Sequence, residues 1–173
     1  MSFSLATYPP FIYMVTSLTY FLMPPTLQLA ALSNVSFLAV LLVSTYKLTE
    51  HLVDRRAGVF AAFLVGLYPI VVATQRYYYL DFGLTAMVSL SLLLLLKSRQ
   101  FQDGKVVLAL AFGMLAGMLS KETFPFYVAP PFAYIFLKAY PNRRALLNAA
   151  ASLAIASTSM LWYVLKPGGL AVI

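Results

Sequence analysis

Residues 57–96 decide the fold, and they read AGVFAAFLVGLYPIVVATQRYYYLDFGLTAMVSLSLLLLL. Two apolar segments flank the polar loop QRYYYLD at 75–81, which holds a cation, three phenol rings and a carboxylate. Apolar runs of roughly 17–25 residues can cross a bilayer as helices, so the pattern predicts a hairpin of two membrane helices. Charged groups are costly beside hydrocarbon. The loop is therefore expected to bind a charged, partly lipidic substrate at the membrane–water boundary.

The composition of the whole chain agrees with this interpretation. Of its 173 residues, 62% are hydrophobic and 10% are charged, whereas soluble domains carry roughly 25% charged residues. The formal charge of +7 arises from basic residues that lie mostly between apolar segments, so membrane orientation explains it better than nucleic-acid binding. We expect one transmembrane domain over residues 1–173, integral and multi-pass.

The predicted fold is all-α, a bundle of about six spans preceded by a helix lying in the membrane interface. The interfacial helix, Phe11–Met23, is too short to cross, and it carries a polar face. That face consists of Tyr13, Thr16, Ser17 and Tyr20. An oblique span continuing through Pro24-Pro25 is the alternative. The six expected spans are Thr26–Tyr46, Ala57–Thr74, Phe82–Leu96, Val106–Ser120, Phe124–Ala139 and Ala145–Leu165.

Two groups of residues inside the expected spans predict contacts between helices. Polar groups cost free energy in lipid, so those of the first span must face protein or water, namely Gln28, Ser33, Asn34 and Ser36. In the fourth span, Ala109, Gly113 and Gly117 recur at four-residue intervals, and such a ridge lets a neighbouring helix approach closely.

The basic residues predict the orientation. Nine lie in turns on one side of the expected bundle, and three, Arg76, Lys121 and Lys166, lie on the other. The side with more lysine and arginine faces the cytoplasm. The loop at 75–81 is therefore expected on the non-cytoplasmic face.

The candidate substrate-binding residues lie in the two loops of that face. They are Arg76, Tyr77, Asp81, Lys121 and Glu122. Asp81 has an alternative role as a helix cap and Lys121 as a snorkelling cation, but paired cations suit a lipid phosphate. We expect Asp81, Arg76 and Lys121 to converge on one cavity, with the interfacial helix along its rim. The chain holds one histidine and no cysteine, so it predicts no metal site, and no cofactor motif is present.

Several short motifs occur in a telling order: Pro9-Pro10 before the interfacial helix, a basic turn, Arg-x-x-x-Leu-Asp at 76–81, and Leu-Ser-Lys at 119–121 after a glycine-rich span. In this order they resemble the N-terminal half of the dolichyl-phosphate-mannose protein mannosyltransferase superfamily. Its bacterial members include the lipid A aminoarabinose transferases, and all are GT-C membrane glycosyltransferases. Many members have a basic residue where this chain has Tyr8.

The resemblance implies a reaction and a partner set. Such enzymes take a sugar from a polyprenyl-phosphate donor and transfer it to a lipid, glycan or protein acceptor on the outer face, in bacteria at the inner membrane. Asp81 matches the second-loop aspartate of the family, and Lys121 matches the lysine that faces the donor phosphate.

The resemblance also leaves a catalytic residue unassigned. The family's catalytic aspartate belongs to a first outer loop that this chain lacks, so we expect a fragment without the first span, that loop and the C-terminal part. Transferase activity of the chain alone is not expected. The alternative function is a non-catalytic membrane subunit or lipid-binding scaffold.

Overall fold

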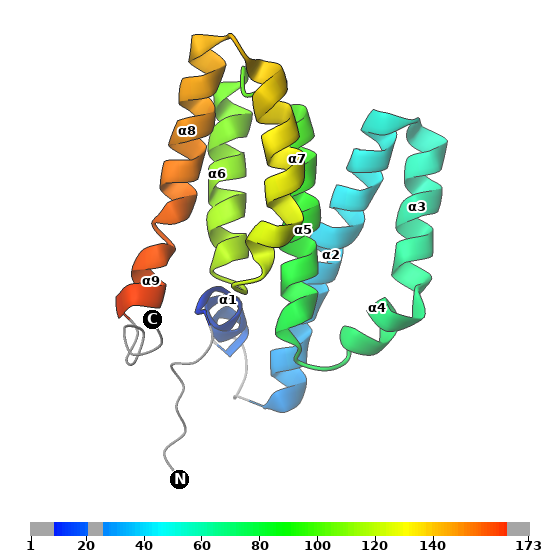
Figure 1. The fold of residues 1–173 in the computed structure, drawn as a ribbon. Coiled ribbons are helices and arrows are strands. Elements are labelled where there is room, and N and C mark those ends of the chain that lie inside the picture. Colours follow the sequence, from blue (N-terminus) through cyan, green and yellow to red (C-terminus); the bar gives the residue numbers. More distant parts are fainter. Residues whose placement is uncertain (1–8, 21–25, 166–173) are drawn as a thin grey trace.

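The computed structural model describes residues 9–20 and 26–165, and this part of the chain is all-helical (Figure 1). The prediction of an all-α fold is confirmed. The helices are α1 Phe11–Tyr20, α2 Leu27–Leu52, α3 Arg55–Leu67, α4 Pro69–Thr74, α5 Leu80–Lys97, α6 Gly104–Met118, α7 Phe124–Ala139, α8 Arg143–Ser157 and α9 Met160–Leu165.

The prediction of six spans is wrong. Within the described residues, three segments are long and apolar enough to cross a membrane: Ala30–Leu52, Leu80–Lys97 and Arg143–Leu165. The expected span Ala57–Thr74 is divided, because α3 ends at Leu67 and Pro69 begins a separate short helix, α4. Proline has no N–H to continue the hydrogen-bond ladder. The apolar helix α6 has 15 residues, a length of ~22 Å against a ~30 Å hydrocarbon core.

Side-chain caps explain where three of the helices begin. Asp54 accepts a hydrogen bond from the Ala57 N–H at the start of α3, and Asp103 accepts two at the start of α6. The side chain of Asn142 caps α8 in the same way. These residues satisfy backbone N–H groups that a helix start leaves unpaired.

Helix α5 holds the bundle together, because it contacts α2, α6 and α7, while α8 packs on α6. The small-residue ridge of α6 is used as expected. Gly113 faces Ser91 and Leu94 of α5, and Gly117 lies directly against the ring of Phe124. The prediction of close helix packing at these two glycines is confirmed.

The turns of the bundle gather at two ends (Figure 1). The α2–α3, α5–α6 and α7–α8 turns lie together at one end, and the α4–α5 and α6–α7 turns lie at the other, beside α1. The first end carries the nine basic residues of the predicted cytoplasmic turns. The second end carries Arg76, Asp81, Lys121 and Glu122.

Helix α1 crosses the second end of the bundle and is seen along its axis in Figure 1. Its first residue anchors it, because the Phe11 N–H donates to the Leu119 carbonyl at 3.0 Å. The prediction of its polar face is wrong at Thr16, which is buried against the protein, while Met14 and Leu18 are exposed. Thr16 turns inward because buried hydroxyls of other elements offer it partners. The expected residues 21–23 of this helix lie outside the described residues.

Candidate functional site

An ion pair joins the two loops at the α1 end of the bundle. The Lys121 ammonium lies 2.5 Å from Oδ1 of Asp81, forty residues earlier in the chain. The side chains are 31% and 63% exposed, respectively, so both are reachable from outside the bundle. The structure therefore brings together two of the residues that the sequence selected.

Helix geometry explains why these two residues meet. Asp81 lies in the first turn of α5, and Lys121 follows the end of the neighbouring helix α6. A carboxylate is favourable at a helix N-terminus and a cation at a helix C-terminus. Because α5 and α6 are adjacent and antiparallel, the N-terminus of α5 and the C-terminus of α6 lie side by side. Asp81 and Lys121 can therefore each stabilise a helix end and also pair with each other.

Asn34 of α2 positions the loop that carries Arg76. Its side-chain amide donates to the carbonyl of Gln75 at 3.1 Å and to that of Tyr77 at 2.7 Å. Asn34 is 1% exposed, so the two hydrogen bonds form where water cannot replace them. Arg76 stands between the two anchored carbonyls, exposed, and it makes no ion pair with any residue in the described ranges. Its approach to the Asp81–Lys121 pair remains a prediction.

A second contact ties the same loop to α1. The hydroxyl of Thr16 is 2.9 Å from the Tyr78 hydroxyl and 3.2 Å from that of Ser33. Burial raises the pKa of the Tyr78 phenol, and the nearby Tyr13 and Tyr20 add to that rise, while its hydrogen bond with Thr16 opposes it. The phenol therefore stays protonated at neutral pH and keeps its hydrogen-bonding proton.

The rings of Tyr77 and Tyr79 meet edge to face at 6.0 Å, and both are more than half exposed. Tyr77 is therefore placed to contact a ligand, as the sequence predicted for that residue. Sequence reasoning missed the positioning roles of Asn34 and Thr16. The available signal was the cost of an amide in an apolar span, which required a polar partner but did not identify it.

An apolar groove of about 720 Å³ runs along the seam between α5 and α6 and is closed at one end by α1. Its lining includes Met87, Leu90, Gly113, Leu119, Phe11 and Met14. Leu119 is two residues before Lys121. The groove therefore ends beside the turn that carries the cation of the ion pair.

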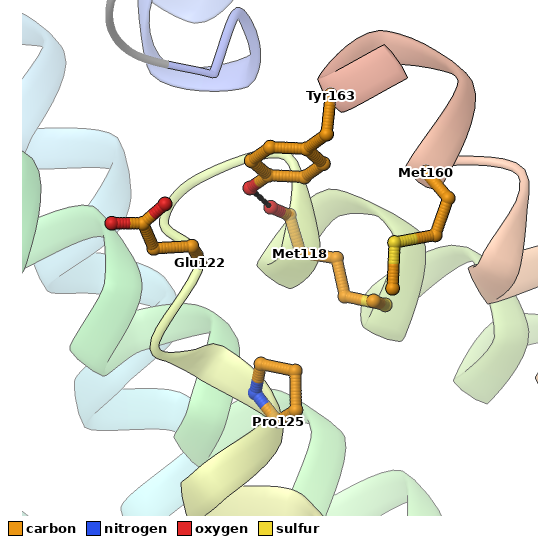
Figure 2. Close-up of a pocket in the computed structure, with 5 residues that line it drawn as sticks. All are labelled: Met118, Glu122, Pro125, Met160 and Tyr163. Carbon is orange, nitrogen blue, oxygen red and sulfur yellow. Dashed lines mark hydrogen bonds between the residues drawn. The ribbon is translucent and has the colours of Figure 1, made fainter. Parts of the chain in front are cut away.

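Glu122 follows Lys121 in the same turn. It lines a separate hollow of about 160 Å³ together with Met118, Pro125, Met160 and Tyr163 (Figure 2). Its carboxylate points away from Met160 and Tyr163 of α9 and is exposed (Figure 2), so the expected contact of Glu122 with substrate remains a prediction. In the described part of the chain, no three histidine or acidic side chains gather where they could hold a metal ion.

Comparison with known proteins identifies one family. A family model described as dolichyl-phosphate-mannose-protein mannosyltransferase matches residues 7–164. No curated protein and no solved structure matches the chain. The family match covers the ion pair, the tyrosine loop, both hollows and every described helix except the last residue of α9.

Proposed function

This chain belongs to the dolichyl-phosphate-mannose-protein mannosyltransferase family, and on that premise we propose that it forms the donor side of a GT-C membrane glycosyltransferase. The donor is a polyprenyl-phosphate-linked sugar, and the acceptor is a lipid, glycan or protein on the outer face. The observation that carries this proposal is the Asp81–Lys121 ion pair at the end of an apolar groove. A cation beside an apolar groove matches a ligand that joins a phosphate to an isoprenoid chain.

The proposed roles of the individual residues follow from their positions. Lys121, held at the groove end by Asp81, contacts the donor phosphate. Arg76, presented by the carbonyls that Asn34 anchors, supplies a second cation. Tyr77 offers an exposed ring to the sugar. The isoprenoid chain lies between α5 and α6, where the groove lining is apolar.

We expect Lys121→Ala to weaken binding of a fluorescent short-chain polyprenyl phosphate about tenfold, because one charge-assisted contact to phosphate is lost. Titration in detergent measures this affinity. Lys138→Ala is the matched control, since Lys138 is an exposed lysine in the last turn of α7, at the opposite end of the bundle. Equal losses in the two variants, or unchanged binding by Lys121→Ala, would contradict the proposal. Sugar turnover by the protein in membranes, lost in Lys121→Ala, would favour a transferase over a lipid-binding scaffold, and it would contradict the expectation that this chain alone is inactive.

The proposed orientation places the site on the non-cytoplasmic face. It rests on the gathering of nine basic residues at the opposite end of the bundle. The chain contains no cysteine, so single cysteines can be labelled without background. We expect Tyr77→Cys to react with a membrane-impermeant maleimide in intact cells, and Gln102→Cys to react only after permeabilisation. Both native residues are exposed, and the reverse labelling pattern would overturn the orientation.

A further inference from the structure

A hollow of about 450 Å³ lies on α3, and two cations stand in it beside three apolar side chains. The residues that line this α3 hollow are Arg55, Arg56, Val59, Phe60 and Phe63. The arginines open the helix at the α2–α3 turn, at the end of the bundle opposite the proposed donor site (Figure 1). The α3 hollow uses no residue of that site, so its occupancy does not depend on the proposed transfer reaction.

The packing of α3 explains why this face of the helix is open. Helix α3 lies at the edge of the bundle and packs against α2 (Figure 1). Gly58 is buried there, and a Cβ atom on it would lie 2.8 Å from the Tyr46 carbonyl oxygen. The apolar residues of the hollow are instead more than half exposed. Because α2 is long and apolar enough to cross a membrane, the acyl chains of a bilayer are the surroundings that this face meets.

The carboxylates nearest in the chain to the two arginines already have other partners. Glu50 pairs with Lys47 at 2.8 Å, and the Asp54 side chain caps α3. Neither Arg55 nor Arg56 forms an ion pair within the part of the chain that the structure describes. Both lie in the first turn of α3, where the helix dipole disfavours a cation and favours an anion. An anion in the hollow would therefore be attracted by both guanidinium groups and by the helix.

We propose that the α3 hollow binds an anionic phospholipid, with its phosphate at Arg55 and Arg56 and an acyl chain against Phe60 and Phe63. Guanidinium groups donate paired hydrogen bonds in a geometry that fits phosphate oxygens. Phe63 lies about 11 Å along the helix from Arg56, which is within the depth of one leaflet of a ~30 Å hydrocarbon core. A soluble phosphate would use the arginines alone, whereas a lipid uses the whole lining.

A tryptophan introduced into the hollow measures lipid at this site. Trp162, the one tryptophan of the chain, lies in α9 at the opposite end of the bundle. Trp162→Phe removes it, and Phe60→Trp then places a single indole in the hollow. The protein is reconstituted in phosphatidylcholine vesicles that contain an increasing fraction of a lipid with brominated acyl chains, which quench tryptophan fluorescence on contact.

We expect brominated phosphatidylglycerol to reach half-maximal quenching at a fraction about tenfold lower than brominated phosphatidylcholine. Two exposed charged contacts together contribute about 1.4 kcal/mol, which corresponds to this factor. Equal quenching by the two lipids would overturn the proposal.

A second pair of consecutive arginines provides the matched control. Arg55→Gln combined with Arg56→Gln should bring the two lipids to equal quenching. Arg143→Gln combined with Arg144→Gln should preserve the tenfold preference, since these arginines also open a capped helix, α8, at the same end of the bundle but do not line the hollow. An equal loss of preference in the two double variants would assign the effect to the overall charge of this end and refute a site at α3.

A soluble headgroup tests the apolar half of the site. Glycerol phosphate carries a phosphate group without acyl chains, so it cannot contact Phe63 as a lipid does. We expect an excess of glycerol phosphate to leave the quenching by brominated phosphatidylglycerol unchanged, relative to sodium chloride of the same ionic strength. Recovery of fluorescence to the level seen with brominated phosphatidylcholine would show that the hollow takes phosphate alone, and binding of a lipid would be refuted.

Discussion

Replacing Gly117 with alanine is expected to lower the free energy of unfolding by about 3 kcal/mol. This value is the upper end of the range typical when a well-packed core receives an added methyl group. A Cβ atom at this position would lie 2.1 Å from the nearest ring carbon of Phe124 and 2.5 Å from a third ring atom. Phe124 is 1% exposed, so its ring has no free space to move into. Unfolding in mixed detergent and denaturant, followed by circular dichroism, measures the change.

The neighbouring glycine of the same ridge is the matched control. A Cβ atom on Gly113 would meet its nearest neighbours at 3.5 and 3.6 Å, which is ordinary contact. Alanine is favoured over glycine within a helix by about 0.5–1 kcal/mol, so Gly113→Ala should be neutral or slightly stabilising. Phe124→Leu, which shortens the opposing side chain, should recover part of the loss in the double variant. Equal effects of the two glycine substitutions would show that the Phe124 contact is not the cause.

The Gly117 contact shows which part of the helix packing could be predicted from the sequence and which part could not. The four-residue spacing of small residues predicted a close approach, because such spacing forms a ridge on any helix. The partner could not be predicted, since Phe124 comes from α7 and Gly113 faces α5. Spacing along one helix sets which side chains share a face. The element that meets this face depends on the packing of the whole bundle.

The predicted number of membrane spans was wrong for a different physical reason. Apolar content shows that a segment avoids water, but it is the same for a helix that crosses the membrane and for a shorter one packed in a bundle. Pro69 lies within the expected span Ala57–Thr74, and it separates α3 from α4. The long apolar helix α5, which has no internal proline, was predicted to within two residues at its N-terminus.

The grouping of the site residues also succeeded only in part. Asp81 and Lys121 were predictable as neighbours, because two short turns at one end of an antiparallel bundle lie at similar depth. Glu122 was assigned to the same site by its adjacency to Lys121 in the chain. Glu122 lines a hollow with Met118, Met160 and Tyr163, and its carboxylate points away from these side chains (Figure 2). The part of Glu122 in substrate binding therefore remains a prediction.

Asn34→Leu is the second substitution expected to have a large effect, and it acts through the backbone of the tyrosine loop. Leucine keeps the branched shape of asparagine but removes the amide that donates to the carbonyls of Gln75 and Tyr77. Each carbonyl left buried without a donor costs about 1–3 kcal/mol. Water is scarce beside a residue that is 1% exposed, so the loop is expected to relieve this cost by detaching from α2.

Trypsin measures this detachment directly, because it cleaves after arginine and Arg76 lies between the two anchored carbonyls. We expect Asn34→Leu to accelerate cleavage at Arg76 at least tenfold, since a loss of about 1.4 kcal/mol in local stability raises the open population by that factor. Cleavage at Arg55 and Arg56, at the far end of α2, provides the internal standard. Ser36→Ala should change neither rate, because the Ser36 hydroxyl bonds only within its own helix, to the Ser33 carbonyl. If Arg76 and the two reference arginines are cleaved faster by the same factor, Asn34 supports the whole fold rather than this loop, and its role in positioning Arg76 is refuted.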